Sequence, residues 1–510
     1  MKKCFSIISS LLALCIFNAC EREFLDGSLD DQPSVDQFFN SAEQVQAATA
    51  SMYGFTWYYF NSKFNIGMGD VYAGNSYCDY SDAIQFKNFA VTQNNQFASE
   101  GWGSLYVTIA NANSIIKNVP AKSKGVSQQV INTAVAEARF IRATAYFYLV
   151  RVWGPVPIIT DASALLSDYK VNRIVENDVY RFIVEDLQFA EDNLPVTPTN
   201  KGRVGRGAAK GMLAKVYLQM KEYDKAKAKA AEVISNESAY GYGLMDNYTD
   251  LFFTSKENNK ESLFALQWVA CQNYGTGNEN QAYFAPYGQG LTGFSDGWGT
   301  FVPSIDIQNE FEANDKRIKP SMFVTNAVYP ELKSASGGYT YDLAASQSSR
   351  TRTNIKKYVV GLPADDGGQG GCNQSYPINT YMLRYADVLL IYAEAVLGSN
   401  STTSDAGALM AFNRVRQRAG LGTKNSLTID DILHERRCEF AFEGQYWYDL
   451  LRLNRSKAKQ MIAAQERGVY SSSGITSYHA SPTDNSFLLP LPQTETDRNP
   501  RLLDAPVNYY

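Results

Sequence analysis

Two helical segments that have to pack closely together place the strongest constraint on how this chain can fold. They lie between Gly207 and Ile234, and a short polar stretch, Lys221 to Asp224, separates them. The first segment carries a large residue, a small residue and a tyrosine at helical spacing, and alanines follow in the second. The residues of this pattern are Leu213, Ala214, Tyr217, Ala226 and Ala230. Because small side chains let helix axes approach closely, the segment predicts a tight helical hairpin.

This spacing is typical of tetratricopeptide repeats, in which each hairpin buries its apolar face against the next. An unrelated helical hairpin is the alternative. Helical periodicity also predicts helices over residues 41–53, 101–119, 130–154, 177–194, 381–397, 405–419 and 428–453. Residues 54–101 and 235–375 lack it and are rich in Tyr, Asn and Gly. The predicted fold class is therefore all-α, with tetratricopeptide-like helical hairpins forming a superhelical scaffold and long irregular loop regions.

Composition excludes several classes of function. The 510 residues are 45% hydrophobic and 19% charged, which is the composition of a globular protein. The net charge of −5 argues against binding to nucleic acid or to an acidic membrane surface. The chain has two histidines, His434 and His479, and seven cysteines without a C-x-x-C pair, so zinc sites built from these residues are not expected. We predict neither a cofactor nor a metal.

The N-terminus predicts export and lipidation. Lys2 and Lys3 precede an apolar run over residues 4–19, which is shorter than the roughly 20 residues that a membrane-spanning helix needs. The run ends at Ala19-Cys20 and resembles the lipobox of bacterial lipoproteins, although Phe17 replaces the usual aliphatic residue. An ordinary secretory signal is the alternative. We predict a lipoprotein signal peptide over 1–19, lipidation of Cys20 as the only membrane anchor, and two regions, 20–235 and 236–510.

Export leaves four cysteines free to form disulfide bonds, and their spacing does not decide whether they pair. They are Cys78, Cys271, Cys372 and Cys438.

A charged cluster near the C-terminus has the residue types of an active site. Its members are Glu435, Arg436, Arg437, Glu439, Glu443, Asp449 and Arg452. Positions 435, 439 and 443 are four residues apart and would share one face of a helix. Because aromatic and aliphatic residues lie among the charges, we predict a partly buried ion-pair network with a structural role, in which Glu443 and Arg436 are paired.

Short matches to catalytic motifs do not change this prediction. Gly293 to Gly297 matches G-x-S-x-G, but no apolar strand precedes it and no suitable histidine is available. Ser114 to Lys117 matches S-x-x-K, but no K-T-G follows. We predict no catalytic residues.

Aromatic residues of the two irregular regions indicate a sugar-binding site. Flat rings pack on the C–H faces of sugars, and neighbouring amides and carboxylates bind the hydroxyl groups. Rigid loops with buried aromatics of their own are the alternative. The predicted ligand-binding residues are Asp70, Tyr72, Asn75, Tyr77, Tyr80, Tyr283, Tyr287 and Trp298. We expect Trp298 to contribute most, because Gly297 and Gly299 on either side would leave its ring approachable.

Several motifs together resemble the SusD/RagB family of outer-membrane nutrient-binding lipoproteins. They are Cys20 followed by FLD and Pro33, GWGSLY from Gly101, EARFIRATAYFYLVRVWGPVP, RYADVLLIYAEA, FNRVRQRAG, ERRCEFAFEGQYWYDLLR and LPLPQTETDRNP. Tyr446 departs from the family pattern, which usually has Arg there. The resemblance implies four tetratricopeptide-like units and a cell-surface lipoprotein that caps a SusC-like TonB-dependent transporter. It also implies that the ligand binds where the two irregular regions meet.

The leading hypothesis is therefore a non-enzymatic, outer-membrane protein that binds oligosaccharide or polysaccharide nutrients and delivers them to its transporter. A surface-attached glycoside hydrolase is one alternative, because two carboxylates suffice for that chemistry. A scaffold that binds peptides or glycopeptides is another. For a capture protein we expect an affinity on the order of micromolar to millimolar.

Overall fold

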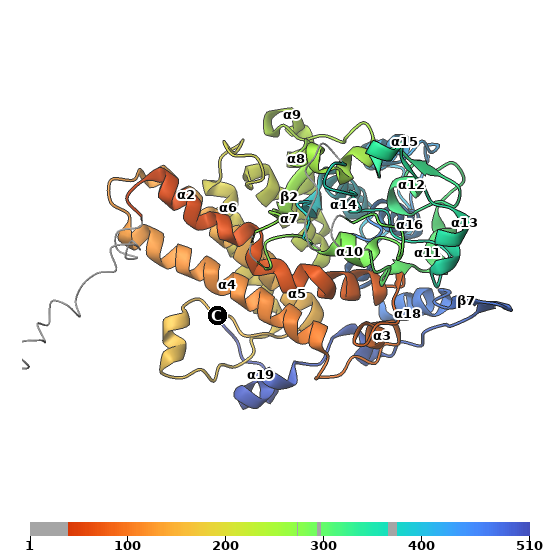
Figure 1. Ribbon diagram of the computed structural model, residues 1–510. Helices are drawn as coiled ribbons and strands as arrows, with labels where there is room; N and C mark the ends of the chain where they lie inside the picture. The colour runs from red at the N-terminus through yellow and green to blue at the C-terminus, as the bar shows by residue number, and fades with distance from the viewer. Residues whose placement is uncertain (1–38, 273, 293–296, 366–374) are drawn as a thin grey trace, which may run out of the picture.

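The protein is mostly helical, and its long helices lie side by side in chain order (Figure 1). A computed structural model describes residues 39–272, 274–292, 297–365 and 375–510. The predicted signal peptide and Cys20 lie outside these residues, as do most of the G-x-S-x-G match and Cys372.

The longer helices are α2 (Ala42–Ala50), α4 (Gln96–Lys122), α5 (Gln128–Trp153), α6 (Glu176–Asn193), α7 (Arg206–Gln219), α8 (Tyr223–Ser235), α14 (Tyr385–Leu397), α15 (Ala406–Arg418), α16 (Ile429–Glu439) and α18 (Arg455–Ala464). The shorter ones are α3 (Ala83–Lys87), α9 (Glu237–Tyr240), α10 (Asn280–Phe284), α11 (Ile305–Glu310), α12 (Ile318–Ser321), α13 (Leu343–Ser348), α17 (Tyr446–Leu450) and α19 (Gln493–Arg498). The 3-10 and π segments are η2 (Ser51–Tyr53), η3 (Phe55–Trp57), η4 (Phe60–Phe64), η5 (Gly67–Val71), η6 (Ala162–Leu166), η7 (Tyr248–Phe252), η8 (Thr254–Lys256), η9 (Ser334–Ser336), η11 (Asp484–Phe487) and η12 (Pro500–Leu503). The strands are β1 (Ser76–Tyr77), β2 (Ser262–Leu266), β3 (Val302–Pro303), β4 (Val328–Tyr329), β5 (Tyr339–Thr340), β6 (Thr380–Arg384), β7 (Val469–Ser471) and β8 (Gly474–Thr476).

The long helices form a continuous stack. Helix α5 packs between α4 and α6, α7 packs between α6 and α8, and α14 packs against α7, α8 and α15. Polar residues start the two longest helices: the Asn95 side chain accepts a hydrogen bond from the Ala98 amide at the start of α4, and the Ser127 side chain accepts one from the Val130 amide at the start of α5. The all-α scaffold predicted from the sequence is confirmed.

The predicted hairpin is formed by α7 and α8. Leu213, Ala214, Ala226 and Ala230 are fully buried. Its turn is shorter than the sequence suggests, since α8 already begins at Tyr223. Lys221 has a left-handed backbone (φ 61°) and reverses the chain.

The strands are short, and each described sheet has two strands. The β2–β6 pair is antiparallel and buried beside α7. The β1–β3 pair matters for function, because it joins the first irregular region to the second: Tyr77 lies opposite Val302, and the Ser304 amide donates to the Asn75 carbonyl (2.9 Å). The two aromatic-rich regions therefore meet in space.

Two predictions of secondary structure were wrong. Residues 54–101 were expected to be irregular, but they contain η3, η4, η5, α3 and the start of α4. Residues 60–73 are almost entirely buried. The 3-10 and π segments in this region therefore lack the alternation of apolar and polar residues by which an amphipathic helix is predicted. Residues 428–453 were expected to be one helix, but the chain breaks after α16, where Phe442 (φ 64°) and Gly444 (φ 70°) take left-handed conformations.

Candidate functional site

The charged cluster is a buried ion-pair network around Glu439. Arg384 contacts Glu439 (2.9 Å), Glu261 (2.5 Å) and Glu443 (2.8 Å), and Arg317 contacts Glu435 (2.6 Å) and Glu439 (3.1 Å). Burial opposes ionisation of Glu439, but Arg418, Arg384 and Arg317 outweigh burial and hold its pKa well below the usual range. Every carboxylate named here is neutralised from within the fold.

As predicted, Glu443 and Arg436 are both buried in ion pairs, but they do not pair with each other. Glu443 lies beyond the end of α16 and pairs with Arg384 and with Lys357 (3.0 Å). Arg436 pairs with Asp387 (2.7 Å) and Asp449 (3.0 Å). All of these side chains are buried, which is the arrangement of a structural network and not of a substrate site.

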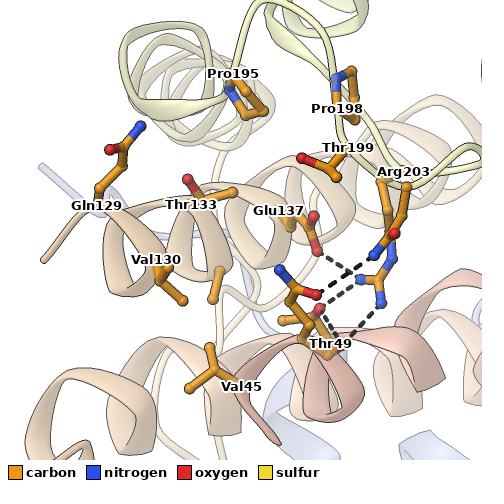
Figure 2. Close-up of a pocket in the computed structure, with 13 residues that line it drawn as sticks. Val45, Thr49, Gln129, Val130, Thr133, Glu137, Pro195, Pro198, Thr199 and Arg203 are labelled. Carbon is orange, nitrogen blue, oxygen red and sulfur yellow. Dashed lines mark hydrogen bonds and ion pairs between the residues drawn. The ribbon is translucent and has the colours of Figure 1, made fainter. Parts of the chain in front are cut away.

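One small cavity, of about 190 Å³, lies between α2, α5 and the segment 195–203 (Figure 2). The Arg203 guanidinium points to Glu137 (2.8 Å) and Thr49 (2.5 Å), as Figure 2 shows. It also donates to the Gln46 carbonyl (2.8 Å). The charged groups of this cavity are thus paired with each other, and no aromatic ring lines the cavity. This cavity does not suit a sugar ring.

A larger cavity, of about 450 Å³, has the chemistry expected of a sugar site, and we name it the aromatic cavity. Its lining residues are Phe55, Thr56, Tyr58, Tyr59, Glu100, Gly103, Ser104, Val107, Tyr274 and Gly275. Phe55, Tyr59 and Tyr274 are exposed, and Tyr274 retains 73% of its accessible surface. Exposed apolar side chains that gather in one place mark interaction sites more often than singly scattered ones do, so this surface is a candidate for ligand contact.

Buried partners fix the rings of this surface. Tyr58 packs edge-to-face on Tyr59 (5.2 Å between ring centroids) and on Tyr274 (5.1 Å). The Glu279 carboxylate accepts hydrogen bonds from the hydroxyls of Tyr58 and Tyr283 (3.3 Å for Tyr283). Burial, followed by Glu279, raises the pKa of Tyr283, so both hydroxyls stay protonated and continue to donate. Through its hydrogen bond with Tyr58, Glu279 thereby connects the irregular region 235–375 to the region 54–101.

Three of the predicted ligand residues remain available on the surface. Tyr80 and Tyr287 are exposed, and Trp298 is half-buried. Tyr80 stacks on Phe97 (6.2 Å). Trp298 packs edge-to-face on Tyr283, at 4.9 Å.

The glycines beside Trp298 have a different role from the one expected. At Gly297 a side chain would collide with Ala285, whose carbonyl oxygen would lie 2.5 Å from the added Cβ, and Gly299 has a left-handed backbone (φ 55°). The glycines therefore allow close packing and a turn, and they do not leave the ring free on both sides.

The structure corrects the assignment of Asp70 and Asn75 as ligand contacts. Asp70 has 0% exposure, and its carboxylate accepts hydrogen bonds from the amides of Phe442 (3.0 Å) and Gly444 (2.7 Å) and from Asn75 (3.2 Å). Burial raises the pKa of Asp70 to about 6. The side-chain oxygen Oδ1 of Asn75 in turn accepts a hydrogen bond from the Arg437 guanidinium (2.8 Å). Both side chains hold the turn after α16 and do not reach solvent.

Tyr72 and Tyr77 are corrected for the same reason. The Tyr72 ring is buried against Trp447 (4.6 Å), and its hydroxyl donates to the Ser486 carbonyl (2.7 Å). Tyr77 is buried, and the Lys87 ammonium lies 4.8 Å from its ring centroid. Tyr283 is also mostly buried and acts as the support of Trp298.

The sequence analysis did not identify Phe55, Glu279 or Val107 as site residues. It also did not select Tyr59 or Tyr274 from the aromatic residues of the two irregular regions. Phe55 and Tyr59 are four residues apart and face the same cavity. That spacing is the one signal that could have grouped them, had the segment been recognised as helical.

The described cysteines are either disulfide-bonded or free. Cys271 takes part in a disulfide bond, whereas Cys78 and Cys438 are buried free thiols. In residues 39–510, apart from the short undescribed gaps, no group of three or more His, Cys, Asp or Glu side chains is placed to hold a metal ion. Over the same residues, no helix combines the length and the apolar character needed to cross a membrane.

Comparisons with known proteins agree with this architecture. Residues 260–509 match the model of the SusD family, and residues 23–218 match the model described as starch-binding associating with outer membrane. A SusD-like protein of Bacteroides ovatus is 36% identical over 97% of this chain and 96% of its own length.

Solved structures show the same fold. One, determined with xylogluco-oligosaccharide, has a TM-score of 0.83 and 34% identity, covering 91% of this chain and 99% of the other. A laminarin-binding SusD-like protein has a TM-score of 0.72 and 25% identity over 90% and 98% of the two chains. From the two family matches, the extended sequence identity and the shared helical stack, we conclude that this chain belongs to the SusD family.

Proposed function

We propose that this protein captures oligosaccharides at the aromatic cavity and at the rings of Tyr80, Tyr287 and Trp298, and that it binds them without catalysing a reaction. The observation that carries the proposal is the pair of exposed rings, Tyr59 and Tyr274, that pack on Tyr58, whose hydroxyl donates to Glu279. Fixed flat rings pack on sugar faces, and tyrosine hydroxyls with Glu100 offer polar contacts at the rim. Support also comes from relatives that bind xylogluco-oligosaccharide and laminarin.

The second part of the proposal is that the protein works at the cell surface, attached through lipidated Cys20, and delivers the glycan to a TonB-dependent transporter. Two findings support this part: the chain belongs to the SusD family, and the model that matches residues 23–218 is described as starch-binding associating with outer membrane. Replacing Cys20 by Ala should release the protein from the outer-membrane fraction. If the Cys20→Ala protein stays with outer membranes in cells that lack a transporter partner, another anchor is present.

Isothermal titration of the purified protein against xylogluco-, laminari- and malto-oligosaccharides and a peptide panel tests the binding proposal. Tyr274→Ala and Trp298→Ala should each weaken glycan binding roughly two- to tenfold. Tyr510→Ala is the matched control, because this exposed tyrosine lies away from the cavity lining, and it should leave affinity unchanged.

Three results would overturn the proposal. Unchanged affinity in both variants would move the site elsewhere. Binding of peptides without any glycan would identify a peptide scaffold. Release of new reducing ends from a bound glycan would identify a hydrolase.

A further inference from the structure

Gly103 occupies an unusual place in the middle of α4. A glycine inside a helix costs about 1 kcal/mol relative to alanine, so its presence calls for a reason. Close packing is not the reason here, since a Cβ added at Gly103 would meet nothing within 4 Å. Gly101, two positions earlier and on the buried side of the helix, shows the opposite situation, because its added Cβ would lie 2.4 Å from the Phe64 ring.

Two cavities meet at Gly103. It lines the aromatic cavity together with Glu100, Ser104 and Val107, and it also lines a second cavity, of about 290 Å³. With about 3.6 residues per turn, Glu100 and Val107 flank Gly103 on one side of the helix, and Trp102 and Tyr106 flank it on the other. We name this second space the distal cavity. Its lining residues are Trp102, Gly103, Tyr106, Pro157, Ile159, Leu165, Tyr169, Val171, Glu495, Arg498, Asn499 and Leu502.

The distal cavity repeats the chemistry of the aromatic cavity. Tyr169 is exposed, and Tyr106 is half-buried with its hydroxyl donating to the Pro157 carbonyl (2.9 Å). Arg498 and Glu495 line the same cavity, and their charged groups lie 3.7 Å apart. Rings beside polar groups suit another part of a sugar chain.

We propose that Gly103 forms the low point of a saddle over which an elongated glycan passes, with one end in the aromatic cavity and the other in the distal cavity. The absence of a side chain at 103 keeps the ridge of α4 low between the two spaces. This inference rests on the proposed function and adds that the preferred ligand is a long chain that crosses the helix. Short oligosaccharides occupy the aromatic cavity alone.

The test compares Gly103→Gln with the wild-type protein over xylogluco- and laminari-oligosaccharides of increasing length. Glutamine is a good helix former, so the variant should fold and melt at the same or a higher temperature. For wild type, affinity should rise with length until both cavities are filled. In Gly103→Gln that rise should disappear, so that long chains lose roughly two- to tenfold in affinity relative to short ones. Tyr169→Ala should reduce the same rise by removing a ring of the distal cavity.

Ala110→Gln is the matched control, because Ala110 is exposed two turns further along the same face of α4 and lines neither cavity. It should bind every length as wild type does. If affinity rises with chain length in Gly103→Gln as steeply as in wild type, the saddle is refuted while the aromatic cavity stands. If wild type binds neither series, the proposed function fails for these glycans and this inference fails with it.

Discussion

Glu443 is a carboxylate on which two buried cations depend. Removing it leaves Lys357 with the Tyr248 hydroxyl (2.7 Å) and deprives Arg384 of one of its acidic partners. Because an uncompensated buried charge is costly, Glu443→Ala should lower the free energy of unfolding by about 3–5 kcal/mol, as measured by chemical denaturation.

Asp246→Ala provides the comparison, because the Asp246–Lys260 pair is largely exposed and should contribute about 1 kcal/mol or less. An unchanged denaturation midpoint for Glu443→Ala, together with lost glycan binding, would mean that Glu443 serves the ligand and not the fold.

The sequence could identify the charged cluster but could not rank the aromatics. Acidic and basic residues among apolar ones already imply mutual neutralisation. Tyr72 and Tyr59 look alike in a segment without a clear period, yet one is buried under Trp447 and the other lines the cavity. Only the three-dimensional path of the 54–101 segment separates them.

The close contact between η5 and the turn after α16 depends on two glycines. A Cβ added at Gly69 would lie 2.3 Å from the Gly444 backbone. Gly69→Ala therefore has to push these elements apart, and we expect a loss of about 1–3 kcal/mol in the free energy of unfolding. Thermal denaturation measures the effect.

Gly103→Ala is the appropriate contrast, since the same added methyl group meets open space there. It should raise stability by up to about 1 kcal/mol. Equal effects of the two substitutions would show that the contact at Gly69 relaxes without cost.

The junction of α16 and α11 should respond to pH. The His434 imidazole lies 2.9 Å from the Glu310 carboxylate, and this contact raises the pKa of His434 above 6.5. Despite burial, His434 and Arg437 lower the pKa of Glu310 below 4.5. The pair therefore stabilises the fold most between pH 4.5 and 6.5. The histidine part is lost as pH rises through its folded-state pKa, and the carboxylate part is lost as pH falls through its own.

Denaturation of wild type and His434→Gln across this range tests the assignment. The difference in unfolding free energy should be largest at mildly acidic pH and should shrink toward alkaline pH. A difference that does not vary with pH would mean that the contact acts through packing and not through charge.

Long helices could be predicted well because their apolar residues recur at helical spacing over several turns. The π and 3-10 segments could not, since their turns do not follow the α-helical period. The same limit hid the break between α16 and α17, where the apolar pattern continues although Phe442 and Gly444 reverse the backbone.

At the scale of the whole molecule, the regions 20–235 and 236–510 depend on each other. Helix α14 packs on α7 and α8, and the buried Lys215 ammonium contacts Asp387 (2.8 Å) and Gln445 (2.7 Å) across the division. Asp70 holds the amides of Phe442 and Gly444 in the same way.

We therefore expect calorimetry of the full chain to show one unfolding transition, and fragments 20–235 and 236–510 expressed alone to lack cooperative unfolding. Two separate transitions, or a fragment that unfolds cooperatively by itself, would show that each region has a self-sufficient core.

The brevity of the strands has a consequence for self-association. In the described part of the chain no strand exceeds five residues, and the longest pair, β2 with β6, is enclosed by helices. Aggregation by strand addition needs a long, open edge of unpaired amides and carbonyls. The folded protein offers little such edge, so concentrated solutions should resist fibril formation until the helical stack itself opens.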